Sequence, residues 1–346
     1  MRIDVIPITE LSEGMKQRWL EIQVSNPDLA GPCFHPDLFI TVGKFCPDVY
    51  VALLYDNNGL TGFLPYLRDQ ASSIAQTIDF CDYQAIIGPK SYHWDINMIM
   101  NKIGISSWHY NALVDFENIR SKRRQLEACE SMRIDLSSGY KEYLLSKKDG
   151  KVKFGGLARK KRLIQSNFGP IHFVPICNDI DVLHRMLFWK SVQHNRDTSW
   201  TKLATELLEY FCFSNQTSID GVFSALYAGN DLLAAYFGIR HQGILHSLVC
   251  SFNPDFKKFS PGLMIWQNLI SSQKELGYHI LDLGPEENKY KRYFSTSTLP
   301  IIKGDFIEVT IRDRIKSIKW LYQGLYPLVQ IVKRMKSNNI TVTNIL

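Results

Sequence analysis

Residues 246–294 read HSLVCSFNPDFKKFSPGLMIWQNLISSQKELGYHILDLGPEENKYKRYF. The apolar run LHSLVCSF, which begins one residue earlier, predicts a strand, and NPDFKKFSPG predicts a basic turn. LMIWQNLISSQKELG has the apolar spacing of an amphipathic helix, YHILDLG predicts a second strand, and PEENKYKRYF predicts a charged loop. This order of elements predicts an α/β unit whose first turn can hold an anionic group.

The basic turn combines two cations with a well-marked helix start. Serine is a good N-cap, and proline suits the first helical position because its missing N–H would be unpaired there. Free backbone N–H groups, the positive helix end and two lysines then meet where a pyrophosphate can lie. The alternative is an ordinary capped helix with two solvated lysines. The residues concerned are Lys257, Lys258, Ser260, Pro261 and Gly262.

The second strand carries an acid at its end. Asp282 interrupts the apolar run Ile280–Leu283, and strand ends beside loops are where α/β folds place ligands. A carboxylate there can take a proton from an amine, and a lysine can hold a phosphate or a developing oxyanion. The alternative is that Asp282 caps the next turn and that the following charges are solvated. The loop adds Glu286, Glu287, Tyr290 and Lys291.

The segments FNPDFKKFSPGLMIWQNLI and GYHILDLGPEENKYKRYF together resemble the C-terminal signature of a known enzyme family. This is the CelD/BcsL-like (cellulose-biosynthesis-protein-like) branch of the GNAT acyltransferase superfamily, a branch related to the Fem aminoacyltransferases of peptidoglycan synthesis. The resemblance is clearest over the last third of the chain. The matching positions are Asp255, Ser260 to Gly262, Gly277, Asp282, Glu286 or Glu287, and Tyr290 with Lys291.

Two hairpin-like segments indicate that one fold is used twice. VALLYDNNGLTGFLPYL begins at Val51 and FSALYAGNDLLAAYFGI begins at Phe223, and Leu54-Tyr55 aligns with Leu226-Tyr227. Chance similarity of two hairpins is the alternative. With the Fem-like resemblance, the pattern predicts an α/β (α+β) fold of tandem GNAT-like domains, each a mixed twisted sheet flanked by helices. We expect an N-terminal domain over 1–145, a catalytic domain over 146–310 and a basic amphipathic helix over 311–346.

In the first unit, the sequence predicts a helix over 10–24 and a second short helix after the turn at PCFHPD. IDFCDYQAIIG (78–88) predicts a strand, a polar turn and a strand. Its Asp82, Tyr83 and Gln84 resemble a D-Y-Q element of the CelD-like branch, so we assign them to the acceptor side, with a plain turn as the alternative. A helix and an alternating strand, HYNALVDF, are expected to complete the unit.

In the second unit, LARKKRL (157–163) predicts a basic helix that either passes near a phosphate or is solvated. The helix over 179–197 is expected to end beside the acceptor cleft, with His194 and Arg196 as substrate contacts. His246 lies in an apolar strand and can act as a base near neutral pH, unless it is a satisfied core histidine. A further strand, IIKGDFIEVTI, follows Phe294.

Composition bears on partners, location and metal sites. The 346 residues are 45% hydrophobic and carry a net charge of +6, which is too modest to predict DNA binding. No apolar run can span a bilayer and the start lacks a signal-peptide pattern, so the expected location is the cytoplasm. The C-terminal helix predicts peripheral contact with the inner face of the plasma membrane, or packing on the protein itself. The seven scattered cysteines are expected to be reduced thiols, with no metal site.

Together these patterns predict an N-acyltransferase that moves an acyl group from acyl-CoA to an amino group of a sugar or cell-envelope precursor. A nucleotide- or lipid-linked sugar is an acceptor of this kind. The alternatives are a Fem-like enzyme that uses aminoacyl-tRNA and a non-catalytic component of a polysaccharide-synthesis complex. The expected catalytic residues are Asp282, His246 and Lys291. The expected donor site is Lys257, Lys258, Phe259, Ser260, Pro261 and Gly262. The expected acceptor contacts are Asp82, Tyr83, Gln84, His194, Arg196, Glu286 and Tyr290.

Overall fold

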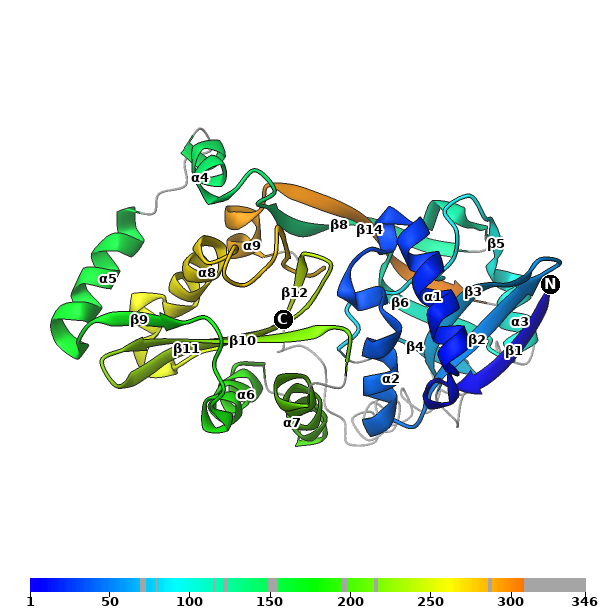
Figure 1. Cartoon of the computed structure of the whole chain (residues 1–346), viewed down its shortest axis with the longest axis horizontal. Coiled ribbons are helices and arrows are strands. Elements are labelled where there is room, and N and C mark those ends of the chain that lie inside the picture. The colour runs from blue at the N-terminus through cyan, green and yellow to red at the C-terminus, as the bar shows by residue number, and fades with distance from the viewer. Residues whose placement is uncertain are drawn as a thin grey trace, which may run out of the picture.

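A single mixed sheet of twelve strands runs through the computed structural model, with helices on its faces (Figure 1). The strand order is β1-β2-β3-β4-β6-β14-β8-β13-β12-β11-β10-β9. A separate two-stranded sheet joins β5 (Trp94–Asp95) and β7 (Ile119–Arg120). The structure describes residues 1–68, 73–78, 80–114, 116–120, 124–148, 155–194, 198–214, 217–285 and 288–307.

The first copy of the fold occupies one end of the sheet. Its strands pair antiparallel from β1 to β4, and β4 then pairs parallel with β6. α1 and α2 precede the β2–β3 hairpin, and α3 connects β4 to β6. The elements are β1 (Arg2–Pro7), α1 (Glu13–Ser25), α2 (Pro36–Phe45), β2 (Val49–Asp56), β3 (Gly59–Arg68), β4 (Ile74–Gln76), α3 (Ile96–Ile103) and β6 (Ser107–Leu113).

The second copy repeats this order at the other end. Its strands pair antiparallel from β9 to β12, and β12 pairs parallel with β13. α6 and α7 precede the β10–β11 hairpin, and α8 connects β12 to β13. The elements are β9 (Ile171–Val174), α6 (Ile180–His194), α7 (Thr198–Phe213), β10 (Asp220–Ala228), β11 (Asp231–His241), β12 (Ile244–Phe252), η5 (Pro254–Phe259), α8 (Pro261–Ser271) and β13 (Ile280–Asp282).

The two hairpins share a bulge as well as a turn. The β2–β3 register shifts between Leu54 and Tyr55, and the β10–β11 register shifts between Leu226 and Tyr227. These are the positions that the sequence alignment of the hairpins equates. The tandem α/β architecture predicted from the sequence is therefore confirmed.

The two copies are tied together by their last strands. β8 (Arg124–Asp135) follows the first copy in sequence but pairs with β13 of the second. β14 (Ser297–Ile307) follows the second copy but pairs with β6 of the first. β8 and β14 also pair with each other along most of their length, at the centre of the sheet. The domain division at residue 145 remains a prediction. Two strand pairs, β8 with β13 and β6 with β14, join residues on opposite sides of that division.

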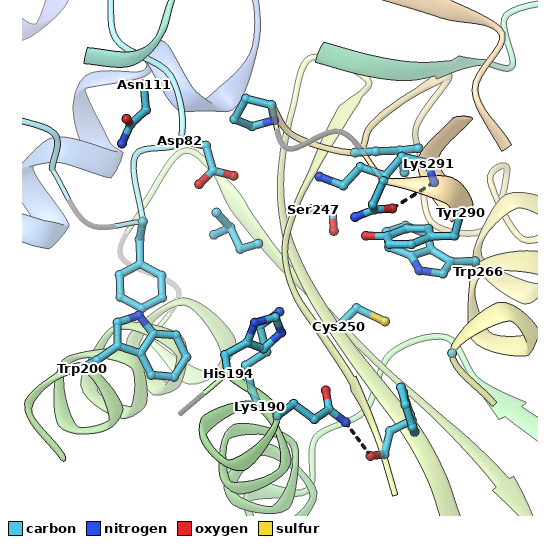
Figure 2. Close-up of a pocket in the computed structure, with 18 of the residues that line it drawn as sticks. Asp82, Asn111, Lys190, His194, Trp200, Ser247, Cys250, Trp266, Tyr290 and Lys291 are labelled. Carbon is cyan, nitrogen blue, oxygen red and sulfur yellow. Dashed lines mark hydrogen bonds between the residues drawn. The ribbon is translucent and has the colours of Figure 1, made fainter. Parts of the chain in front are cut away.

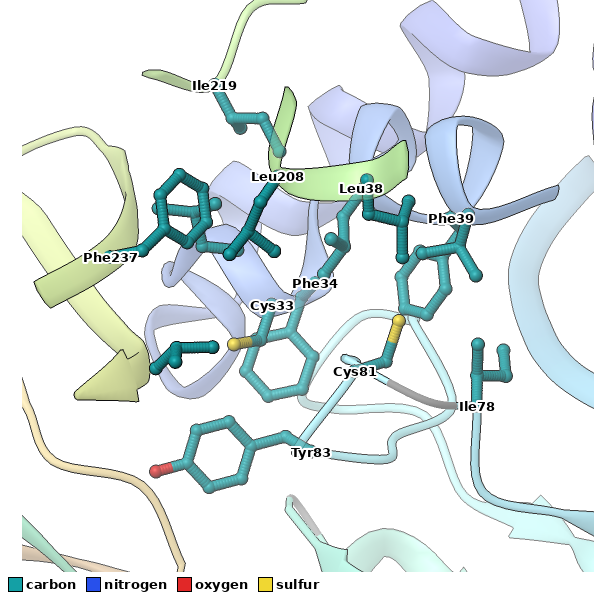
Figure 3. Packing of buried hydrophobic residues seen from close by; sticks show 14 of the residues in the cluster. Cys33, Phe34, Leu38, Phe39, Ile78, Cys81, Tyr83, Leu208, Ile219 and Phe237 are labelled. Atoms are coloured by element: carbon teal, nitrogen blue, oxygen red, sulfur yellow. The ribbon is translucent and has the colours of Figure 1, made fainter. Parts of the chain in front are cut away.

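An apolar core shared by both copies fills the space between them on one face of the sheet. Phe34 and Leu38 of the first copy belong to the same buried cluster as Leu208 of α7 and Phe237 of β11 (Figure 3). On the opposite face each copy has a core of its own, around α3 in the first and around α8 in the second. Continuous burial on one face fixes the relative position of the copies and so of the side chains between them.

Most helices expected from the sequence are present, and two local expectations are wrong. Residues 78–88 form no named strand; Gln84 and Ile87 make single bridges to Leu113 and Phe63 instead. The charged tail after β13 contains a helix, α9 (Lys289–Phe294), which Asn288 caps by accepting a hydrogen bond from the Lys291 N–H at 3.2 Å. α4 (Tyr140–Lys148) and α5 (Gly155–Phe168) link the copies. The helix predicted over 311–346 lies outside the described residues.

Candidate active site

A wedge opens in the sheet between β12 and β13. The two strands pair only over Ile244–His246 and Ile280–Asp282, where β13 ends while β12 runs on to Phe252. Within the described part of the chain, no strand pairs with this edge of β12 beyond His246. A polar edge of this kind can pair with an extended ligand.

A bulge shapes the middle of β12. Phe237 pairs with Val249 and Gly238 with Ser247, so Leu248 is an extra residue in the ladder. Gly238 allows this geometry, because a Cβ there would lie only 2.5 Å from the His246 carbonyl oxygen. A bulged residue leaves the regular ladder, which makes the backbone here a candidate hydrogen-bond donor to a ligand.

The basic turn leads from β12 into α8 beside the wedge. α8 begins at Pro261 as predicted, but Ser260 is not a conventional cap: it adopts the left-handed conformation, and its side chain makes no capping hydrogen bond. The Ser260 hydroxyl instead accepts a hydrogen bond from Lys160 of α5 at 2.7 Å. The basic helix predicted over 157–163 thus reaches the turn. Asn253 caps η5 by accepting a hydrogen bond from the Asp255 N–H. The start of α8 has no side-chain cap.

The two lysines of the turn differ in position. Lys257 lines a cavity, together with Ser260 and Gly262. Lys258 lies over the ring of Phe259, with 4.9 Å between its Nζ and the ring centroid, and Phe259 itself is buried. Of the predicted donor residues, Lys257 and the helix start are therefore placed to contact a ligand, whereas Phe259 supports the turn from below.

Residues 80–84 of the first copy form an excursion that extends towards the second. Three consecutive side chains of this excursion have different partners. Asp82 Oδ2 lies 2.9 Å from His246 Nε2, and the Tyr83 hydroxyl donates to Asp282 Oδ1 at 2.7 Å. Gln84 Oε1 accepts from two backbone N–H groups of β6, each at 3.0 Å. The D-Y-Q element is therefore more than a plain turn, because it joins the copies over a buried acid.

That buried acid is Asp282. Its carboxylate accepts hydrogen bonds from Tyr83, from Arg133 Nε at 2.9 Å and from the Gly284 N–H at 2.9 Å. Burial alone would raise its pKa, but the contacts with His246 and the Arg133 charge hold the pKa of Asp282 well below its usual range. Asp282 is only 1% exposed, and both of its carboxylate oxygens already accept hydrogen bonds. It is therefore a poor direct proton acceptor.

His246 lies between two carboxylates. Its Nε2 faces Asp82, and its Nδ1 makes an ion-pair contact of 3.5 Å with Asp282 Oδ1. Burial acts against the charged imidazolium, but the contacts with the carboxylates of Asp282 and Asp82 outweigh it and raise the pKa of His246 well above 6.5. Burial keeps Cys33 a neutral thiol by raising its pKa. A protonated, 1% exposed His246 positions its neighbours and cannot accept a further proton.

α9 brings two more predicted residues to the site. Lys291 Nζ donates to the Gly284 carbonyl at 3.3 Å, and the residue is only 6% exposed. Tyr290 stacks on Trp266 of α8, with 5.7 Å between the ring centroids. Gly284 lies where the groups converge: a Cβ there would be 3.3 Å from Asp82 Oδ2 and 3.6 Å from Lys291 Nζ.

A cavity of about 820 Å³ joins these features (Figure 2). Asp82, Asn111 and Trp200 lie on one side of it and Trp266, Tyr290 and Lys291 on the other, with Ser247 and Cys250 of β12 between them. Burial raises the pKa of Cys250 to about 12, so its thiol is not a ready nucleophile. The predicted site residues that line the cavity are Asp82, Gln84, His194, Lys257, Ser260, Gly262, Tyr290 and Lys291.

Apart from Lys258, Phe259 and Pro261 of the basic turn, the other predicted residues divide into two groups. Asp282, His246 and Tyr83 are buried behind the cavity, where they support Asp82 and the wedge. Arg196 and Glu286 lie outside the described residues, so their roles remain predictions. Within the described residues, no group of three or more His, Cys, Asp or Glu side chains could hold a metal ion, and no helix is long and apolar enough to cross a membrane.

Sequence reasoning missed several contributors. Arg133 and Ser131 of β8 contact the buried acid and Tyr83, with 2.5 Å between Ser131 Oγ and the Tyr83 hydroxyl oxygen. Phe80 and Trp200 stack at 5.8 Å between ring centroids on the acceptor side. No local pattern marks these residues, because strand exchange and packing between the copies bring them to the site. A left-handed backbone at Phe80 is likewise invisible in the sequence.

Comparison with known proteins identifies the second copy. Residues 154–292 match the family model of an acetyltransferase (GNAT) domain, which spans the strands, the basic turn and α9 described above. No curated protein matches the chain. Residues 154–292 are therefore similar to a GNAT domain, and the repeated strand order gives the chain a tandem GNAT-like fold.

Solved structures extend the similarity over the full length. FemX is 10% identical, with 93% of this chain and 99% of that chain covered and a TM-score of 0.54. A tandem GNAT protein from the clavulanic acid biosynthesis pathway is also 10% identical, with 89% and 99% covered and a TM-score of 0.48. At such low identity, the likeness to FemX shows a common fold.

Proposed function

We propose that the protein is an N-acyltransferase that takes an acyl group from acyl-CoA and transfers it to an amino group. One observation carries this proposal: an open wedge between β12 and β13, an uncapped helix start with Lys257, and the carboxylate of Asp82 all border one cavity. This arrangement has an anionic site for the donor, a polar strand edge for its extended arm and an acid for the amine.

The donor is proposed to lie along β12. Its pyrophosphate accepts hydrogen bonds from the N–H groups at the start of α8, next to the positive charges of Lys257 and Lys160. Its pantetheine arm follows the unpaired edge of β12 beyond His246, as an added strand would. The thioester then reaches the bulge at Leu248, where a backbone N–H can stabilise the oxyanion.

The acceptor is proposed to enter from the side of the first copy. Asp82 can bind an amine there, and the stacked rings of Phe80 and Trp200 offer a flat surface for a sugar ring. Among the described residues that line the cavity, Asp82 is the one acid, against the cationic or potentially cationic side chains of Lys190, Lys257, Lys291, Lys303 and His194. This balance favours an acceptor that also carries an anionic group, such as a phosphate.

The single acid and the several cations of the described cavity lining also support a more specific acceptor. An amino sugar or cell-envelope precursor linked to a nucleotide or lipid has both an amine and a phosphate. The match of several spaced residues supports membership of the CelD/BcsL-like branch. A cytoplasmic location with peripheral membrane contact through 311–346 belongs to the same proposal. Lys291 is proposed to hold a substrate oxygen, because it lines the cavity next to Gly284.

The first experiment is calorimetric titration of the full-length protein with CoA and acetyl-CoA, followed by thiol release from acetyl-CoA in the presence of glucosamine, glucosamine 1-phosphate or phosphoethanolamine. We expect acetyl-CoA to bind and thiol release to depend on the amine, with the phosphorylated amines preferred. Absence of binding by any CoA species would overturn the acyl-CoA proposal. Aminoacyl-tRNA dependence, or a binding role without catalysis, would then become the leading explanation.

A further inference from the structure

The geometry points to Asp82, a residue of the first copy, as the proton acceptor for the reaction carried out on the second, with His246 and Asp282 as the residues that position it. This inference rests on the proposed function and names a base that the described cavity-lining residues of the second copy do not supply. Sequence reasoning placed Asp82 among the substrate contacts and looked for the base at Asp282 or His246.

Asp82 differs from both of those residues in its access to the cavity. Its side chain is 37% exposed, whereas the side chains of His246 and Asp282 are 1% and 2% exposed. Only its Oδ2 is engaged, by His246 Nε2 at 2.9 Å. Among the described residues, no hydrogen-bond partner is assigned to its Oδ1, and its carboxylate points into the cavity (Figure 2). Among the described residues that line the cavity, it is the one carboxylate that an incoming amine can reach.

A chain of contacts fixes the orientation of that carboxylate. Asp82 is held by His246, His246 by Asp282, and Asp282 by Tyr83 and Arg133. The chain thus crosses from the first copy to β12, to β13 and to β8. Because its inner members are buried, they hold their geometry without competition from water. Asp82 is then positioned by the second copy although it belongs to the first.

Charged and titratable groups of several elements lie around Asp82. His246 and Lys291 face it as cations, from β12 and α9. Behind His246 lie Asp282, Arg133 of β8, Tyr83 of the same excursion and Cys33 of η3 (Pro32–Phe34). Tyr83 and Cys33 are uncharged near neutral pH, since burial raises the pKa of each. With these neighbours, the Asp82 carboxylate can accept a hydrogen bond, and then a proton, from an incoming amine.

The proposed step balances as follows. The amine nitrogen attacks the thioester carbon, the N–C bond forms, and the carbonyl electron pair moves to the oxygen. A proton passes from the nitrogen to Asp82 Oδ1. Collapse of the intermediate breaks the C–S bond, the thiolate leaves with the electron pair and takes up a proton, and Asp82 releases its proton to water. Amine and acyl-CoA thus give amide and CoA thiol.

Asp82→Asn tests this inference, because the amide keeps the size of the side chain and can still accept from His246. Asp231→Asn is the matched control; it removes the same charge at the exposed turn of the β10–β11 hairpin. Thiol release from acetyl-CoA is measured against pH with the amines named above, and with hydroxylamine, whose nitrogen is uncharged near neutral pH. Non-enzymatic release by hydroxylamine is subtracted.

We expect Asp82→Asn to lower kcat with the amines by about 100-fold or more, with acetyl-CoA affinity unchanged. Hydroxylamine should be affected much less. His246→Gln should lower kcat with the amines and affect hydroxylamine much less, as Asp82→Asn does, because the contact that orients the Asp82 carboxylate is altered. A merely structural role for His246 would lower the two rates equally.

Other outcomes separate the inference from the proposed function. If Asp82→Asn binds acetyl-CoA and retains the wild-type kcat and pH profile, the assignment of Asp82 is wrong while the acyltransferase remains. An equal loss with the amines and with hydroxylamine also contradicts it, since the defect is then not in proton transfer. Wild-type protein that binds acetyl-CoA but acylates none of these amines overturns the proposed amine acceptor, and the inference with it.

Discussion

The two copies differ most where they should be most alike, in the space beside the fourth strand of each. In the second copy, β12 parts from β13 after His246 and leaves a wedge. In the first copy, β4 ends at Gln76, and after the excursion the chain returns to fill the equivalent space. Ile87 exchanges two backbone hydrogen bonds with Phe63 of β3, and Gln84 exchanges two with Ala112 and Val114 beside β6. The first copy has therefore closed its own wedge.

The helices that follow show the same contrast. α3 of the first copy is capped by Asp95, whose carboxylate accepts from the Met98 N–H at 3.0 Å. α8 of the second copy has no side-chain cap and starts beside Lys257. A carboxylate at a helix start occupies the place of an anionic ligand. Under the proposed function, the difference teaches that the second copy holds the donor at its uncapped helix start, while the first copy uses its matching connection to form the acceptor side.

The largest expected effect concerns the buried contacts of Asp282 that connect the two copies. Asp282→Ala should lower the free energy of unfolding by about 3–5 kcal/mol, because it leaves Arg133 and His246 buried without their shared anion. Denaturant titration measures it. Asp4→Ala, which removes a half-exposed carboxylate of β1, should change stability by about 0.5 kcal/mol or less. Similar small losses for both variants would show that the buried acid does not hold the copies together.

The lowered pKa of Asp282 predicts that the stability of the protein depends on pH. The pKa of Asp282 is lower in the folded protein than in the unfolded chain, so its contribution to stability is present above the unfolded value, about 4, and is lost as pH falls through the folded value. The stability difference between wild type and Asp282→Asn should therefore shrink below about pH 4. A difference that stays constant from pH 7 to pH 3 would contradict the assigned shift.

A smaller effect tests the donor turn. Lys257→Ala should weaken acetyl-CoA binding about tenfold, since one charged contact with a phosphate is lost. Lys258→Ala is a neighbouring control that removes the same charge from a side chain over Phe259, and it should weaken binding far less. Calorimetry distinguishes the two. Equal losses would mean that general positive charge, and not the position of Lys257, attracts the donor.

The smallest effect compares the two helix starts. Asp95→Ala should cost about 1 kcal/mol of stability, because it removes a capping hydrogen bond. Ser260→Ala removes no such bond and should cost only a few tenths of a kcal/mol, while its lost contact with Lys160 weakens the donor turn. Thermal unfolding of both variants checks the order. A larger cost at Ser260 would show that the second helix start is capped after all.

Local chemistry was enough to predict much of this molecule from its sequence. The spacing of apolar residues identifies α8, and the run ending at Asp282 identifies β13, because both signals depend on neighbours in the chain. The two hairpins predict the repeat for the same reason. The basic turn at Lys257 and the acid at Asp282 also follow from residues next to each other.

What the sequence could not decide depends on contacts between distant segments. The environment of Asp282 depends on hydrogen bonds from Tyr83, about two hundred residues away, and from Arg133 of β8, which pairs with the other copy. That burial removes Asp282 and His246 from direct access to substrate and leaves Asp82 exposed. The closed wedge of the first copy likewise depends on backbone pairing across the sheet. Local pattern thus determined which chemical groups are present, and only tertiary packing decided which of them a substrate can reach, because burial and charge pairing are properties of the assembled fold.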